Sequence, residues 1–183
     1  MARHLHPRLP AMDMDMVELL GRCAGLELKA ADFYDTLTRR FAGDTELARF
    51  WSAMAAEERE HARKLATWRE LIAAEPPEQR PRAAGFGVEI EEIERLLDEA
   101  CAAAATADEE EAFALALGLE GSEINAIYET LLRASPMARY PDFKERVKSE
   151  STGHHVKLLE MAGHRCKSER TRLRMELLAA HDR

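Results

Sequence analysis

Glu58 and His61 are the first residues in this sequence whose types and spacing suggest chemistry, within the segment Glu57-Glu58-Arg59-Glu60-His61. Side chains three residues apart on an α-helix project to the same side, about 60° apart around the axis. This spacing lets one helix give a carboxylate oxygen and an imidazole nitrogen to one metal centre in a bundle. An ion pair, or a glutamate that reaches out to solvent, would also explain the pair, so the metal interpretation requires matching ligands on other helices.

The helix that must carry this pair runs from about Asp44 to about Ala73. Glu58 and His61 fall within its apolar stripe, which therefore faces the core. An ionised carboxylate in such a place costs several kcal/mol unless it has a partner. The stripe is formed by residues spaced three and four apart, namely Leu47, Trp51, Met54, Leu65 and Trp68.

A first long helix, from about Asp13 to about Phe41, presents Glu27 as the polar residue in an otherwise apolar stripe. Tyr34 lies two turns later on the same face, either as a packing aromatic residue or as a hydroxyl that serves the site. The break at Gly43-Asp44 is so short that the first two helices must be antiparallel.

A third long helix reaches about Arg133 and carries Glu120 and Glu123 on one side, followed by Tyr128. Thr106 and Asp108 are competing N-caps for its start. The stretch 113–119 is apolar nearly all round, which predicts burial on several sides. A short amphipathic helix over 88–104 or a second subunit would cover it, and we expect a homodimer.

A fourth long helix is predicted over about 142–162, with His154 in its apolar stripe. Glu150 and Ser151 precede His154 by four and three residues, and both spacings place a side chain on the same face. His155 points about 100° away and is expected to face a partner or solvent. Beyond it, a basic approach from Arg165 leads to a short helix over 167–180, and this surface is either solvated or a docking patch for an acidic partner.

These elements predict an all-α protein with four long helices in one bundle. The segment 75–87 holds three Pro and two Gly, and it would be a crossover between two antiparallel helical hairpins. The predicted organisation is a flexible tail over 1–12, the bundle over 13–165 and a C-terminal helix over 166–183.

Composition supports this class and excludes others. Of 183 residues, 46% are hydrophobic and 33% charged, and the net charge is −8, which argues against nucleic acid as a partner. No apolar run approaches the ~18 residues of a membrane span, and the start of the chain does not resemble a secretory signal. The three Cys contain no Cys-x-x-Cys pair, so reduced thiols in a cytoplasm are the simplest expectation.

Assembled in one bundle, the polar residues of the four stripes can fall in one layer. Four or five carboxylates and two imidazoles would then share a dry core, and their mutual repulsion would require protons or cations. Two divalent ions would balance four carboxylates, and a carboxylate and imidazole donor set suits iron or manganese.

The sequence resembles the ferritin-like superfamily, and within it the rubrerythrin-type di-iron proteins. The resemblance covers about 14–162. It rests on Glu27 with Tyr34, on Glu57-Glu58-Arg59-Glu60-His61, on Glu120-Gly121-Ser122-Glu123 with Tyr128, and on His154.

The resemblance implies a role for each ligand of a pair of iron ions (Fe2+/Fe3+), although manganese or a single metal stays open. Glu27 and Glu120 would be terminal carboxylates, Glu58 a bridging carboxylate, His61 and His154 terminal imidazoles, and Glu123 the extra carboxylate of rubrerythrin-type sites. Such sites reduce hydrogen peroxide or react with dioxygen, which suggests a peroxidase in oxidative-stress defence. Tyr34 and Tyr128 would supply protons or hydrogen bonds.

Two departures from the family pattern leave alternatives open. Ser151 occupies the position of a second bridging glutamate, which Glu150 would have to replace; otherwise the site would hold one metal, hold two weakly, or lack redox chemistry. The rubredoxin module, which carries Cys-x-x-Cys pairs, is also missing, so we expect an external electron donor. A metal-handling bundle without turnover and a non-metal interaction bundle are the remaining hypotheses.

Overall fold

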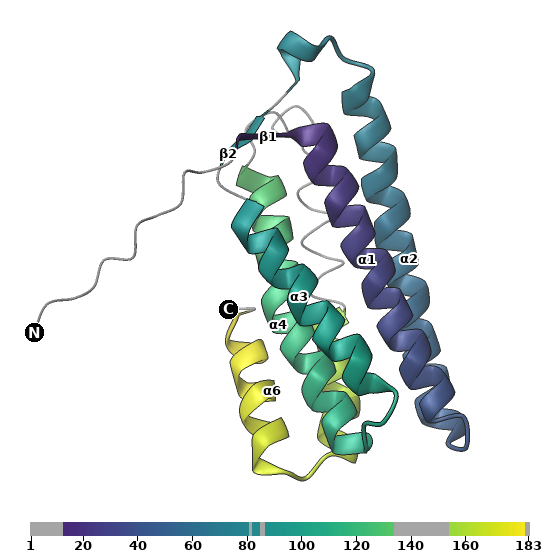
Figure 1. Ribbon diagram of the computed structural model, residues 1–183. Helices are drawn as coiled ribbons and strands as arrows, with labels where there is room; N and C mark the ends of the chain where they lie inside the picture. The colour runs from purple at the N-terminus through teal and green to yellow at the C-terminus, as the bar shows by residue number, and fades with distance from the viewer. Residues whose placement is uncertain (1–12, 81, 85–86, 134–153, 182–183) are drawn as a thin grey trace, which may run out of the picture.

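The computed structural model describes residues 13–80, 82–84, 87–133 and 154–181, and of residues 122–133 it describes the helical backbone alone (Figure 1). The all-α class is confirmed, because helices account for nearly all of these residues. No helix in the described ranges is both long and apolar enough to cross a membrane.

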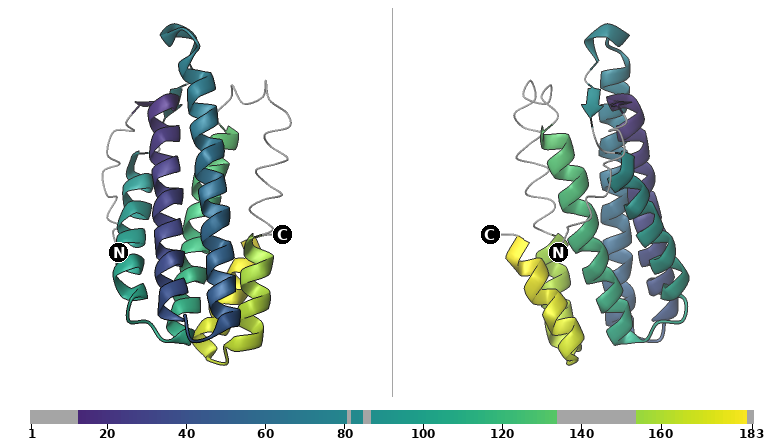
Figure 2. Two further views of the ribbon diagram at one scale, coloured as in Figure 1. Left: turned by 90° about the vertical axis from the view of Figure 1, so that its right-hand side faces the viewer. Right: turned by 60° about the vertical axis from the view of Figure 1, so that its left-hand side comes forward.

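The first two helices, α1 (Met16–Arg40) and α2 (Thr45–Ala73), form an antiparallel pair. Each begins at an aspartate whose side chain accepts hydrogen bonds from backbone N–H groups of the first turn, which a helix start leaves without partners. Asp15 caps α1, and Asp44 caps α2 with bonds of 3.0 and 3.1 Å. The two helices lie side by side along their length (Figure 2), as their short connection requires.

A further hairpin, distinct from the predicted pairing of the third and fourth long helices, joins the expected short extra helix α3 (Gly87–Ala104) to α4 (Glu109–Arg133). Of the two N-caps considered for α4, Asp108 is the one used. Its carboxylate accepts from the backbone N–H of Glu111 at 2.9 Å, and the Glu111 carboxylate accepts from the backbone N–H of Asp108 at 3.1 Å. This reciprocal pair is a capping box, and it fixes where the helix that carries Glu120 begins.

Residues 154–165 form the described part of the fourth bundle helix, and α6 (Glu169–His181) follows. The start of α6 is held on α4 by Glu110, whose carboxylate accepts from the backbone N–H groups of Lys167 and Ser168 and from the Thr171 hydroxyl. The predicted C-terminal helix therefore packs on the bundle.

A short β-ribbon is a feature that the sequence did not predict. β1 (Asp13–Asp15) pairs antiparallel with β2 (Arg82–Ala84), with Met14 opposite Ala83. It follows the 3-10 turn η1 (Pro77–Gln79) in the connector. Two strands of three residues are too short to show a periodic pattern. The ribbon ties the crossover to the start of α1 and leaves the bundle unchanged.

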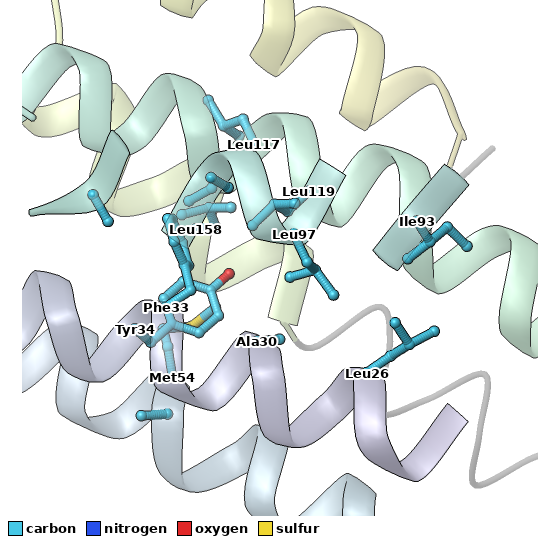
Figure 3. Close-up of a cluster of buried hydrophobic side chains, with 14 of the residues drawn as sticks. Leu26, Ala30, Phe33, Tyr34, Met54, Ile93, Leu97, Leu117, Leu119 and Leu158 are labelled. Atoms are coloured by element: carbon cyan, nitrogen blue, oxygen red, sulfur yellow. The ribbon is translucent and has the colours of Figure 1, made fainter. Parts of the chain in front are cut away.

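The bundle interior is a continuous apolar core to which α1, α2, α3 and α4 all contribute (Figure 3). The prediction that 113–119 is buried on several sides holds, because α3 and α6 both pack on α4. Gly118 marks the close approach of α6, since a Cβ there would lie 2.8 Å from the guanidinium of Arg174.

Arg165 joins three helices at one end of the bundle. Its guanidinium contacts Asp44 and Glu109 at 2.6 Å each and Glu46 at 3.3 Å. These carboxylates stand at the first turns of α2 and α4. One cation thus joins the 154–165 helix to the starts of two others, at the end of the bundle where both hairpin turns lie.

Candidate metal centre

Helices α1 and α2 place Glu27, Glu58 and His61 together in the core. All three side chains are buried, Glu58 with only 2% of its surface exposed. Glu58 and His61 lie between Met54 and Leu65, two core residues of the α2 stripe. The apolar pattern that folds α2 onto α1 is therefore what carries these polar groups inward.

The other half of the bundle brings Glu120 from α4 and His154 from the 154–165 helix. Both are buried, with exposures of 3% and 1%. Leu117, Leu119 and Leu158 are core residues on the same two elements (Figure 3). Carboxylate and imidazole side chains from four helices therefore meet in a region from which apolar side chains exclude water.

The two oxygens of Glu58 face different histidines, His61 and His154. Oε2 lies 3.0 Å from Nδ1 of His61, and Oε1 lies 3.2 Å from Nδ1 of His154. Each histidine also faces a second carboxylate, since His61 Nδ1 is 3.9 Å from Glu27 and His154 Nδ1 is 3.5 Å from Glu120.

Two groups of three potential ligands result, and they share Glu58. One consists of Glu27, Glu58 and His61, and the other of Glu58, Glu120 and His154; within each, the ligand atoms lie within 4.8 Å of one another. Two adjacent cations bridged by one carboxylate fit this plan. The donor set of oxygen and imidazole nitrogen suits iron or manganese.

The hydrogen bonding of the second group supports a metal-ion site. Nδ1 of His154 and Oε2 of Glu120 are buried, yet neither makes a well-directed hydrogen bond to the described residues. Buried polar atoms are nearly always satisfied, so such a cluster calls for an explanation. A cation that accepts a lone pair from each side chain would provide one.

Proton affinities in the cluster are strongly perturbed. Burial alone would lower the pKa of His154, but the surrounding carboxylates of Glu120, Glu57 and Glu58 raise it to about 12. Burial alone would raise the pKa of Glu58, but the contacts with His154 and His61 lower it to about 2. Without metal, a proton on His154 therefore compensates part of the carboxylate charge.

Tyr34 extends the site beyond the potential ligands. Its buried hydroxyl donates a 2.7 Å hydrogen bond to Oε1 of Glu120, the oxygen that faces His154. The ring is held by stacking on Trp51, with centroids 5.8 Å apart, and by an edge contact with Phe33. Of the two roles considered for Tyr34, the structure thus provides a hydroxyl at the site as well as an aromatic packing residue.

Three of the predicted site residues are not placed by the structure. The side chains of Glu123 and Tyr128 lie in the part of α4 described only as backbone, and Glu150, with Ser151, lies outside the described residues. Their roles remain predictions.

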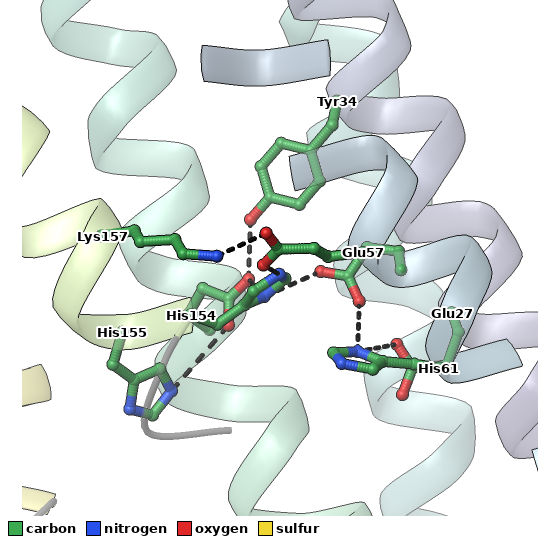
Figure 4. A network of polar contacts seen from close by, with 9 residues as sticks. Glu27, Tyr34, Glu57, His61, His154, His155 and Lys157 are labelled. Atoms are coloured by element: carbon green, nitrogen blue, oxygen red, sulfur yellow. Dashed lines mark hydrogen bonds and ion pairs between the residues drawn. The ribbon is translucent and has the colours of Figure 1, made fainter. Parts of the chain in front are cut away.

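The expectation for His155 was wrong. It is fully buried, and its Nε2 lies 3.8 Å from Oε2 of Glu120, so it borders the site (Figure 4). Helix geometry places His155 about 100° around the axis from His154, but it does not show that the 154–165 helix is buried on that side too.

Glu57 and Lys157 are site neighbours that sequence reasoning missed. Glu57 Oε2 lies 2.8 Å from Nε2 of His154, and Lys157 forms an ion pair with the same carboxylate. The contact with His154, more than burial or Lys157, sets the pKa of Glu57, which is lowered to about 2. The direct succession of Glu57 and Glu58 was the available signal, but it did not reveal a partner on another helix.

The comparison with protein families identifies this arrangement. The family model of rubrerythrin matches residues 18–149, well over half of the chain. The chain belongs to the rubrerythrin family. No curated protein and no solved structure matches it at a significant level.

Rubrerythrins are ferritin-like di-iron carboxylate proteins, so this membership and the observed cluster point to the same chemistry. The matched region contains Glu27, Glu58, His61 and Glu120 and ends five residues before His154. The described part of this rubrerythrin-family chain thus holds buried Glu and His groups capable of binding metal.

Proposed function

We propose that this protein is a di-iron oxidoreductase that reduces hydrogen peroxide or dioxygen and receives electrons from an external donor. The single observation that carries the proposal is the division of Glu58 between two buried ligand groups. One carboxylate whose two oxygens face two histidines is suited to bridging two iron ions. A bound iron pair would supply the two electrons that, with two protons, reduce hydrogen peroxide to two water molecules.

The residues around the pair would set up this reaction by holding the ions and by excluding water. Glu27 and Glu120 would each hold one ion, and Glu58 would contribute to both groups of ligands. The apolar walls formed by residues such as Phe33, Met54 and Leu158 keep bulk water from the buried groups. Dry surroundings strengthen the electrostatic interactions within the site.

Tyr34 is the described residue best placed to handle a proton. Its hydroxyl proton lies on the hydrogen bond to Glu120 Oε1, so it can be transferred at the edge of the site without entry of solvent. Tyr128 stays a second candidate on sequence grounds alone. A cytoplasmic location, where a small reductase or electron carrier could serve as donor, and a homodimeric state are further parts of this proposal.

The test is catalytic peroxide consumption by iron-loaded protein supplied with a chemical reductant. We expect many turnovers per chain for the wild type and a loss of at least 100-fold for Glu58→Ala. Glu60→Ala is the matched control, because Glu60 is on the same helix but pairs with Arg63 at the surface; it should retain wild-type activity. Fewer than one turnover in wild type that carries its full iron content would refute the oxidoreductase role.

A second function, metal binding or iron handling without turnover, is favoured by one observation in the sequence. Ser151 stands where rubrerythrin-type proteins have a second bridging carboxylate. With one bridge fewer, the site would hold metal but be less able to stabilise the oxidised pair. Stable binding of iron together with a single stoichiometric reaction with peroxide, and no repeat cycles, would select this function.

A further inference from the structure

The two ring nitrogens of His154 have different surroundings. Nδ1 faces Glu58 and Glu120, at 3.2 and 3.5 Å. Nε2 faces away from this group toward Glu57, whose Oε2 lies 2.8 Å away, within hydrogen-bonding distance. Glu57 belongs to neither group of potential ligands, and about a third of its side chain is exposed.

Glu57 is itself held from two sides by one helix. Lys157 pairs with Oε1 of Glu57, while His154 faces Oε2 (Figure 4). His154 and Lys157 are three residues apart, hence on the same side of the 154–165 helix. The carboxylate of Glu57 thus spans the gap between α2 and this helix, with one oxygen directed to the core and one toward the surface.

This arrangement has a defined consequence for a histidine that binds metal. Such a histidine usually donates its other ring N–H to a carboxylate or carbonyl, which fixes its tautomer and orientation and makes the coordinating nitrogen more basic. The hydrogen bond made by one nitrogen therefore decides which nitrogen meets the metal.

We propose that Glu57 is the positioning residue for the metal subsite formed by Glu58, Glu120 and His154. Its carboxylate, 2.8 Å from Nε2 of His154, would accept the Nε2 proton in the metal-bound protein and so commit Nδ1 to the metal, and Lys157 holds the carboxylate in place. This inference rests on the proposed metal site and adds to it a residue that controls affinity for one of the two metals.

The competing explanation is that Glu57 and Lys157 form only a structural link between two helices. That link would contribute to folding stability but would leave metal affinity and the state of His154 unchanged. The two explanations therefore differ in readouts other than stability.

The experiment compares wild type with Glu57→Ala, the isosteric Glu57→Gln, and Glu60→Gln as a control for a lost charge on α2. Titration of each metal-free protein with Co(II) gives the affinity of both subsites. The histidine ring nitrogens of the Zn(II)-loaded proteins, labelled with 15N, are then observed by NMR.

For wild type we expect two metals and an Nε2–H of His154 protected from solvent exchange. Glu57→Ala should weaken one site 10- to 100-fold, as loss of such outer partners typically does, leave the other within about 2-fold, and remove the protection. In Glu57→Gln the amide oxygen still accepts the proton, so the loss should be smaller, and Glu60→Gln should match wild type. If Glu57→Ala fails to fold, the comparison of Glu57→Gln with Glu60→Gln decides.

Two results would overturn the inference. Unchanged affinities and an unchanged His154 signal in both Glu57 variants would refute it while leaving the metal centre of the proposed function intact. A folded wild type that binds neither Co(II) nor Zn(II) would refute both together.

Discussion

The hydroxyl of Tyr34 donates a 2.7 Å hydrogen bond to Oε1 of Glu120, 86 residues away in the sequence. The bond joins α1 to α4 inside the core, and both side chains are buried. Tyr34 therefore orients the carboxylate of Glu120, which is one of the potential metal ligands. The same bond gives the first testable prediction.

Tyr34→Phe should destabilise the metal-free protein by about 1–3 kcal/mol, because it removes a hydrogen bond to a buried charged group while keeping the ring. Urea unfolding of Tyr34→Phe, Glu120→Gln and the double variant measures the coupling between the two residues. We expect this double-mutant cycle to give a coupling free energy of at least about 0.5 kcal/mol, because the two residues are in direct contact. Strictly additive effects would show that the contact contributes nothing.

The stability of the metal-free protein should depend on pH in a direction fixed by the carboxylates. Glu57 and Glu58 have folded-state pKa values lowered to about 2 from 4.5. Their contribution to stability is therefore present above about pH 4.5 and is lost as the pH falls toward 2. Urea unfolding at pH 5, 4 and 3 should show a steady decline that Glu57→Gln makes shallower. Stability that stays level or rises over this range would contradict the assignment.

His154 should produce the opposite slope at higher pH. Its pKa is raised from 6.5 to about 12 in the folded state, so its contribution is complete below about pH 6.5 and decreases as the pH rises toward 12. Together with the carboxylates, this predicts maximal stability of the metal-free protein between about pH 4.5 and 6.5. The variant His154→Gln should lose the decline on the alkaline side, which unfolding curves at pH 7, 8 and 9 would reveal.

Metal binding should release protons, because His154 must give up its proton to become a ligand. Near pH 7 we expect about one proton per metal bound at the subsite that contains His154. Calorimetric titration with metal in buffers of different ionisation enthalpy measures this number. Binding without any proton release would mean that His154 is not a ligand.

Arg165→Met should reduce stability without changing metal content. The guanidinium joins three carboxylates at one end of the bundle, but it is partly exposed, so a loss of about 1 kcal/mol is expected. Arg165→Lys should recover only part of it, since an ammonium group lacks the planar fork of donors. A change in metal content would show that this end of the bundle is coupled to the site.

The residues that could be predicted from sequence share one property. Glu27, Glu58, His61, Glu120 and His154 each interrupt or extend an apolar stripe, so helical periodicity alone directs them to the core. Periodicity also gave the order of the helices, and the short break at Gly43-Asp44 gave the antiparallel directions of the first two.

The features that could not be predicted from the sequence depend on contacts with other elements, which the pattern of a single helix does not show. Glu57 lies beside the stripe of α2, and its importance shows only when Lys157, a hundred residues later, is placed next to it. His155 was predicted to face outward from its angle on one helix, whereas the fold buries it fully. The β1–β2 pair depends on backbone hydrogen bonds between two segments that have no side-chain pattern.

The most direct test of the central claim, a pair of metals bridged by Glu58, is metal content per chain. Wild type and Glu58→Ala would be expressed with iron and manganese available, purified, and analysed for metal and for helical structure. We expect about two metals per wild-type chain and less than one in the folded variant. Folded wild type without metal, or a variant that retains two metals, would contradict it.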